Sequence, residues 1–223
     1  CCGDNYYGCF PNLYAIRGSQ YRNIAEWIHS LDVLRAYNAE ALLPGHTEPI
    51  LGAENVAEVL TNFRDAIDWI LETTLAGMNA GKTIDALASE IQLPKKYASL
   101  PYLGEHYGCT EWTVRAIYTA YLGWFDGNPT SLHPLAPETR AQKMLALAGG
   151  REKMAEAARA ALDEQDYQWC LELCDLLLAD AEDAQTLLLK ANAMERLAEQ
   201  ETSANGRHYY IACAKEIREK LAQ

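Results

Sequence analysis

His46 is the residue whose setting best suits metal chemistry. It follows the segment Ala-Leu-Leu-Pro-Gly at positions 41–45, a short apolar run that ends in a tight turn. Such a segment can present one imidazole at the rim of a site, where histidine is a common ligand of hydrolytic zinc. That zinc takes about three protein ligands and keeps one position open for water. Because the sequence contains no His-x-His-x-Asp-His cluster and no His-Glu-x-x-His motif, His46 predicts only part of a metal site.

The remaining histidines lack the spacing of a ligand set. His29 falls within a helical pattern and is expected to be exposed. His133 and His208 are interpreted as surface or capping residues. His106 lies in a tyrosine-rich irregular stretch and is a candidate pocket residue.

The seven cysteines are scattered and form no Cys-x-x-Cys pair, which disfavours a disulfide framework. Cys170 and Cys174, one helical turn apart among leucines, are interpreted as small core residues. This usage favours a reducing compartment such as the cytoplasm, while a periplasmic or secreted location stays open if a signal was lost. The first residue is Cys1 rather than methionine, so we expect the C-terminal part of a longer enzyme.

With 223 residues the chain can form one large or two modest domains. Its formal net charge of -12 disfavours binding to nucleic-acid phosphates and to anionic lipid. A small anionic substrate is still compatible with this charge, because a local basic pocket can exist in an acidic protein. No apolar run reaches the roughly 18–20 residues that a membrane-spanning helix needs.

Residues 1–52 are predicted to be α/β. The segment 12–16 is strand-like and ends at Gly18. Residues 21–37 carry apolar side chains at helical spacing, and residues 41–43 form a second, buried strand. This order favours the edge of a layered α/β domain.

Residues 53–223 are predicted to be helical. The first part contains a long amphipathic helix, a short helix, an irregular tyrosine-rich segment and a further helix with Thr110 as its N-cap, at residues 53–78, 83–91, 94–109 and 110–125. Gly77 and Gly81 are expected to end the first of these helices.

Residues 136–223 show helical pairs that are interrupted at 165–167 and 181–184. Small residues recur at packing positions, which is typical of tetratricopeptide (TPR) repeats with a period of about 34 residues. A free-standing solenoid usually needs about three repeats, so these helices are expected to pack on a preceding domain or on a partner subunit. The predicted fold class is therefore mainly α, with TPR-like helix pairs, preceded by a short α/β segment.

Three segments together resemble one family. They are Gly-Asp-Asn-Tyr-Tyr-Gly-Cys-Phe-Pro-Asn-Leu-Tyr-Ala-Ile-Arg-Gly at 3–18, Leu-Pro-Gly-His-Thr-Glu-Pro at 43–49 and Tyr-Leu-Gly-Trp-Phe-Asp-Gly-Asn-Pro at 121–129. In this order they look like the alkyl sulfatases of the metallo-β-lactamase superfamily. The resemblance implies that residues 1–52 are the C-terminal remnant of a catalytic domain. It also implies that residues 53–223 are a helical dimerisation domain of a homodimer, and that an N-terminal catalytic segment is missing.

The resemblance extends to individual residues. His46 matches the family's last histidine ligand, and Asp4 lies in the stretch where the family places an acidic metal ligand. Asn12 lies where a contact with substrate sulfate is expected, and the planar guanidinium of Arg17 could bind sulfate or steady a loop carboxylate. These matches imply a site with two zinc ions, incomplete in this chain, and a small anionic alkyl sulfate as substrate. By itself the chain is expected to be inactive.

The implied chemistry is hydrolysis of a sulfate ester, in which anionic oxygens shield the attacked centre. Two zinc ions would neutralise this charge and lower the pKa of a bound water to about 7. An alkyl chain needs an apolar channel, to which tyrosines between Tyr97 and Tyr121 could contribute. Two alternatives stay open: a non-catalytic, TPR-like interaction module that binds a basic peptide, and another hydrolase of the metallo-β-lactamase fold that uses His46.

Overall fold

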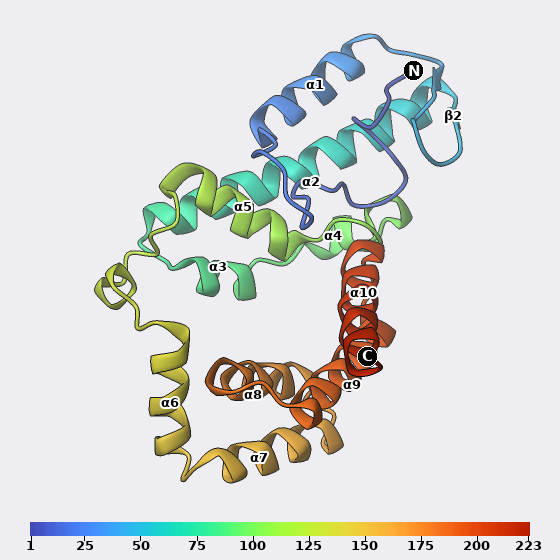
Figure 1. Ribbon diagram of the computed structural model, residues 1–223. Helices are drawn as coiled ribbons and strands as arrows, with labels where there is room; N and C mark the ends of the chain where they lie inside the picture. Colours follow the sequence, from blue (N-terminus) through green and yellow to red (C-terminus); the bar gives the residue numbers. More distant parts are fainter. The chain divides into compact units, whose positions relative to one another are not determined.

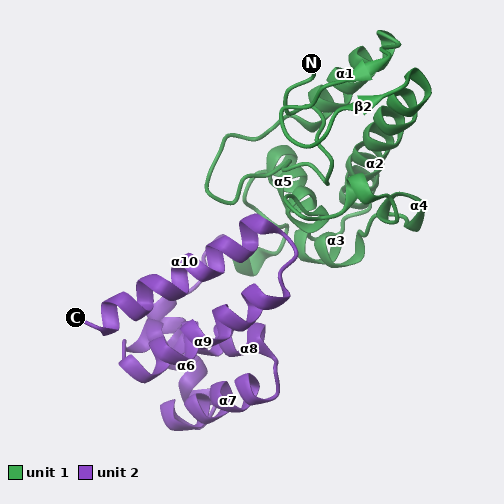
Figure 2. Ribbon diagram, turned by 90° about the vertical axis from the view of Figure 1, so that its right-hand side faces the viewer, with its two compact units in different colours: residues 1–131 green, residues 132–223 purple.

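A computed structural model describes residues 1–223 of the protein, which form ten α-helices and one two-stranded sheet. The mainly α fold class predicted from the sequence is confirmed. The chain divides into two compact units, unit 1 at Cys1–Ser131 and unit 2 at Leu132–Gln223 (Figure 2). None of the helices has both the length and the apolar composition that crossing a lipid bilayer requires.

Unit 1 contains five of the helices and the sheet. Helix α2 is the longest of them, and α1 and α5 pack along it (Figure 1). The elements are α1 (Ile24–Ala36), β1 (Ala41–Leu42), β2 (Ile50–Leu51), α2 (Ala53–Asn79), α3 (Ile84–Glu90), α4 (Lys95–Ala98), the 3-10 turn η1 (Pro101–Leu103) and α5 (Thr110–Leu122). A second 3-10 turn, η2 (Pro129–Leu132), follows α5.

The core of unit 1 forms around α2 because its apolar residues recur at helical spacing. Leu60, Phe63, Ile67 and Ile70 make up one buried face. Phe63 is fully buried, and its ring meets that of Tyr6 edge to face with the ring centroids 4.9 Å apart. Removing one such side chain from water contributes about 1.5–3 kcal/mol, so this face holds the surrounding loops against α2.

Residues 1–52 share this core. Their buried side chains pack in the same cluster as those of α2 and α5; they include Tyr6, Phe10, Leu13, Ile24, Leu31 and Leu42. The predicted boundary between residues 52 and 53 therefore does not coincide with the boundary of a compact unit. The interpretation of residues 1–52 as the remnant of a catalytic domain stays a prediction.

The strand predicted at residues 12–16 is wrong. This segment pairs with no strand and forms turns instead, in which Leu13 N–H donates to Pro11 O and Gly18 N–H donates to Ala15 O. Strand β1 was expected, but its antiparallel partner β2 is too short to leave a pattern in the sequence. A local alternation of buried and exposed residues predicts a strand only where a neighbouring strand can pair with it.

The predicted helices of unit 1 are present, with shifted ends. Gly77 lies inside α2, which ends before Gly81, a residue with a φ of 77°. The irregular segment 94–109 contains the short elements α4 and η1. Thr110 is the first residue of α5 rather than its cap, and α5 ends at Leu122, before Gly123, instead of reaching residue 125.

Unit 2 consists of five helices: α6 (Pro137–Leu147), α7 (Arg151–Asp163), α8 (Tyr167–Asp180), α9 (Ala184–Gln200) and α10 (Ala204–Leu221). Each helix from α7 onward packs on the next, and α6 packs on α8. Asp166 and Asp183 cap the N-termini of α8 and α9 by accepting hydrogen bonds from backbone N–H groups, so both helices begin at the interruptions that the sequence predicted. Cys170 and Cys174 are fully buried core residues, as expected. The TPR-like interpretation of these pairs stays a prediction.

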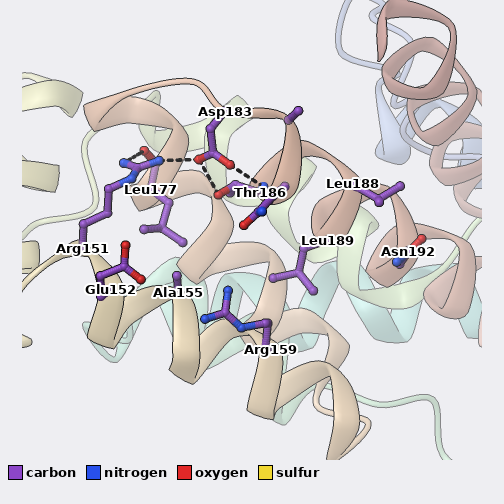
Figure 3. A pocket seen from close by; sticks show the side chains of 12 residues that line it. Arg151, Glu152, Ala155, Arg159, Leu177, Asp183, Thr186, Leu188, Leu189 and Asn192 are labelled. Carbon is purple, nitrogen blue, oxygen red and sulfur yellow. Dashed lines mark hydrogen bonds and ion pairs between the residues drawn. The ribbon is translucent and has the colours of Figure 1, made fainter. Parts of the chain in front are cut away.

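Arg151 joins the start of α7 to the end of α8. Its guanidinium donates to the carbonyl oxygen of Leu177 at 2.8 Å and forms an ion pair with Asp183 (Figure 3). It also donates to the carbonyl oxygen of Ala181 at 2.8 Å and forms an ion pair with Asp180. Leu177 O already accepts the Ala181 N–H, so Arg151 adds a second hydrogen bond there and bonds to the carbonyl of the residue that follows α8. Burial favours the neutral form of Asp183, but hydrogen bonds from Thr186 and Arg151 outweigh it and hold the pKa of Asp183 below its ordinary value.

We expect Arg151→Ala to lower the free energy of unfolding by about 2 kcal/mol, because it removes several hydrogen bonds to a charged, partly buried donor. The stabilisation from the Arg151–Asp183 ion pair is present above the ordinary aspartate pKa of about 3.9 and is lost as the pH falls through the depressed pKa of Asp183 in the folded state. The difference in free energy of unfolding between the parent chain and Arg151→Ala should therefore shrink in acid. Urea denaturation as a function of pH measures this, with exposed Arg159→Ala as the control. Equal losses in both variants would contradict it.

Candidate active site

A cavity of about 400 Å³ in unit 1 brings together all four residues singled out for metal and substrate binding. They come from two loops, the N-terminal loop that precedes α1 and the turn between β1 and β2. The lining residues are Asp4, Tyr7, Cys9, Asn12, Arg17, Arg22, Trp27, His46, Thr47, His106 and Tyr107. The cavity is therefore built from segments far apart in the sequence.

Asp4 and His46 face one another on one wall of the cavity. The distance from His46 Nε2 to Asp4 Oδ1 is 3.6 Å, and both side chains are largely exposed. Their loops are joined by the hydrogen bond from Gly45 N–H to Gly3 O. A side chain at position 45 would place its Cβ 2.6 Å from Asp4 Oδ1, so glycine is what allows the two loops to approach.

The residue after His46 has an unusual backbone. Thr47 has a φ of 68°, in the left-handed region that β-branched residues rarely adopt. Gly8 N–H donates to Thr47 Oγ1 at 3.1 Å, which ties this strained turn to the N-terminal loop. Backbone strain of this kind clusters at functional sites, so its position next to His46 supports treating this turn as a candidate site.

Other lining residues, which we call the second wall, carry positive charge and hydrogen-bonding groups. Arg17 and Arg22 both line it, and Arg22 Nη1 donates to Asn12 O at 2.6 Å. Asn12 is 2% exposed, and its Oδ1 has no hydrogen-bond partner. A buried polar atom without a partner beside a cavity is typical of a site that binds a ligand or water. This wall thus combines cationic groups with an unsatisfied buried amide.

Tyr7 contacts residues of both groups. Its hydroxyl oxygen accepts a hydrogen bond of 2.6 Å from Asn12 N–H, and its ring stands perpendicular to that of His46 with centroids 6.3 Å apart. Burial raises the pKa of Tyr7 to about 12, so its hydroxyl stays neutral at physiological pH. The sequence offered no signal for this residue beyond the tyrosine pair at positions 6 and 7.

The third segment of the cavity is the loop before α5, which contributes His106 and Tyr107. Phe10 N–H donates to Gly104 O, and Gly108 N–H donates to Phe10 O, so this loop pairs with the N-terminal loop. Gly108 is packed against backbone: a Cβ there would lie 2.0 Å from Pro11 O. His106 lines the cavity, and the sequence had marked it as a candidate pocket residue. Of the tyrosines from Tyr97 to Tyr121, Tyr107 lines the cavity.

The donor types fit part of a zinc site. Zinc binds carboxylate oxygen and imidazole nitrogen at about 2.0–2.2 Å, and two ligands of one tetrahedral ion lie about 3.4 Å apart. The observed 3.6 Å between Asp4 and His46 is close to that separation. The structure contains no group of three or more His, Cys, Asp or Glu side chains with metal-binding geometry. Asp4 and His46 therefore fit as two ligands of a larger set.

Unit 2 has a wider groove of about 620 Å³ between α7 and α9, shown in Figure 3. Its charged lining residues carry both signs, and Arg151 and Asp183 are already paired with each other. This groove is therefore not the acidic groove that a basic peptide would need. Another groove of unit 2 is lined by Asp163, Glu195, Glu199 and a single basic residue, Arg196, so the interaction module stays an alternative. We take the cavity of unit 1 as the candidate site because it contains the residues singled out from the sequence.

Comparison with known proteins places these observations in a family. Residues 83–220 match a family described as alkyl sulfatase dimerisation. A linear primary-alkylsulfatase from a Pseudomonas species is 40% identical over 213 residues, which cover 95% of this chain and 40% of that protein. The alkyl/aryl-sulfatase BDS1 of Saccharomyces cerevisiae is 30% identical, over 93% of this chain and 33% of that protein.

A solved structure shows the same fold. The stereoselective inverting sec-alkylsulfatase Pisa1 from Pseudomonas sp. superposes with a TM-score of 0.91 at 32% identity, covering 97% of this chain and 35% of that one. The present chain spans about 40% or less of the length of these relatives.

Proposed function

This chain belongs to the alkyl sulfatase dimerisation family, and from that premise we propose that it forms part of a zinc-dependent alkyl sulfatase. The reaction would be hydrolysis of an alkyl sulfate ester to an alcohol and sulfate. One observation carries this proposal: a potential zinc-ligand pair and two arginines line the same cavity. The names of the relatives support the substrate class.

In the proposed site, Asp4 and His46 are two of the ligands of a zinc ion at one side of the cavity. Zinc bound there would supply positive charge and a water of lowered pKa. The Gly3–Gly45 hydrogen bond and the strained Thr47 turn fix the two ligands relative to each other before metal binds. Such preorganisation lowers the cost of binding, because less freedom is lost at that moment. The other ligands would come from residues outside these 223.

The arginine wall holds the anionic head group. A guanidinium can donate two parallel hydrogen bonds to the oxygens of a sulfate, which fixes its orientation as well as its charge. Arg17 carries this role in our proposal, and Asn12 supplies a neutral contact from its buried amide. The rings of Trp27 and Tyr107 offer apolar surface for the first carbons of the alkyl chain.

Binding of octyl sulfate to the chain tests this assignment. We expect Arg17→Gln to weaken the affinity at least about tenfold, because a charge-assisted contact of about 1.5–3 kcal/mol is lost. Isothermal titration calorimetry below the micellar concentration measures it, and octanol serves as the uncharged comparison. Lys143→Gln removes an equal charge from an exposed position outside the cavity and is the control. Unchanged affinity in Arg17→Gln, or equal binding of octanol, would reject the sulfate-binding role.

We further propose that the helical region mediates homodimerisation, in line with the family description. Light scattering coupled to size-exclusion chromatography should then give twice the chain mass of 24.9 kDa, and the mass should persist on dilution into the low micromolar range. A monomer at every concentration would contradict the dimer and would favour a different role for the helices.

A further inference from the structure

Tyr7 links the metal side of the cavity to its anion side. It is 7% exposed, and its ring meets the rings of His46 and Tyr107 edge to face, with centroids 6.3 and 6.1 Å away. Its hydroxyl oxygen accepts a hydrogen bond from Asn12 N–H. The carbonyl oxygen of Asn12 in turn accepts a hydrogen bond from the Arg22 guanidinium. The hydrogen bond from Asn12 N–H thereby fixes the position of the hydroxyl.

The hydroxyl proton of Tyr7 has no acceptor in the protein. The only hydrogen bond at this oxygen is the one it receives from Asn12, so the O–H remains free to donate into the cavity that Tyr7 lines. A hydroxyl that already accepts a hydrogen bond is a stronger donor, because the two bonds polarise each other. Burial disfavours the phenolate, so this donor keeps its proton across the physiological range.

We propose that Tyr7 is a substrate-binding residue whose O–H donates a hydrogen bond to the anionic head group of the ester. This inference rests on the proposed function of the cavity. Tyr7 adds a neutral donor to the cavity that the cationic Arg17 also lines.

Two comparisons separate a direct contact from a structural role. Tyr7→Phe removes one oxygen and keeps the edge-to-face contacts, so only the donor and the acceptor for Asn12 N–H are lost. The same substitution in an Asn12→Ala background shows whether the hydroxyl acts only by positioning the Asn12 amide, because that amide is then already absent.

Octyl sulfate binding to the full 223-residue chain, followed by calorimetry at neutral pH, is the test. We expect Tyr7→Phe to bind about tenfold more weakly, and Tyr14→Phe, altered at an exposed tyrosine outside the cavity, to match the parent chain. In the Asn12→Ala background, Tyr7→Phe should weaken binding by a further factor of about ten.

The possible results distinguish this inference from the proposed function. If Arg17→Gln weakens binding but Tyr7→Phe does not, the Tyr7 contact is overturned and the function stands. If Tyr7→Phe weakens binding in the parent chain but not in the Asn12→Ala background, Tyr7 only positions Asn12, and the direct contact is again overturned. If the parent chain and Arg17→Gln bind octyl sulfate equally poorly, both the function and the inference fail.

Discussion

Replacing Gly108 by alanine is expected to lower the free energy of unfolding by about 3 kcal/mol and to abolish ligand binding in the cavity. The added Cβ would lie 2.0 Å from Pro11 O and 2.9 Å from Asn12 Cα. Both obstacles are backbone atoms, so no side-chain rotation relieves the overlap. The loop before α5 must then separate from the N-terminal loop and break the pairing between Phe10 and residues 104 and 108.

A glycine elsewhere in unit 1 provides a matched control. In Gly77→Ala, within α2, the new Cβ meets the Leu87 Cδ2 methyl group at 2.3 Å. This methyl can move by rotation of its side chain, and alanine favours a helix over glycine by about 1 kcal/mol, so the net change should be small. Urea denaturation and octyl sulfate titration of both variants measure the difference. A Gly108→Ala protein as stable as Gly77→Ala would show that the two loops are not held together.

Substitution of either member of the Asp4–His46 pair is expected to abolish zinc binding by the chain. A structural zinc site with four ligands is worth about 10–16 kcal/mol, or about 3 kcal/mol per ligand, so two ligands give a dissociation constant of about tens of micromolar. Asp4→Asn and His46→Ala each remove one ligand, which corresponds to about a 100-fold loss of affinity. Calorimetric titration with zinc at neutral pH detects this change.

His133→Ala controls for loss of an exposed histidine that lies outside the cavity. We expect this variant to bind zinc like the parent chain. Comparable zinc affinity in the parent chain, His46→Ala and His133→Ala would mean that zinc binds somewhere other than the proposed pair. The same outcome would remove the basis for treating this cavity as part of a metallo-hydrolase.

Helices with strong periodicity could be predicted from the sequence, and short elements could not. The buried face of α2 repeats over many turns, so its pattern is independent of the rest of the chain. In contrast, β2 has two residues and depends on its partner β1, and segment 12–16 alternates like a strand but has no neighbour to pair with. Helix α5 ends before Gly123, although the pattern of apolar residues continues beyond this glycine, so the sequence predicted too long a helix.

The candidate site shows the same division. Asp4, Asn12, Arg17 and His46 were proposed from a Pro-Gly-His turn and a resemblance, both carried by contiguous segments, and the structure places all four along one cavity. Tyr7 was not singled out because its contacts with the Asn12 backbone and the His46 ring appear only in the folded chain. The loop containing His106 can approach the N-terminal loop only because Gly108 has no side chain, and this requirement is visible only in the folded backbone.

Anomalous diffraction from zinc-soaked crystals of this chain, recorded on either side of the zinc absorption edge, tests the central claim most directly. We predict a peak bound by both Asp4 Oδ1 and His46 Nε2, at about 2.0–2.2 Å from each atom. Anomalous density that occupies other sites and leaves these two side chains without metal would contradict the assignment of this cavity to a zinc enzyme.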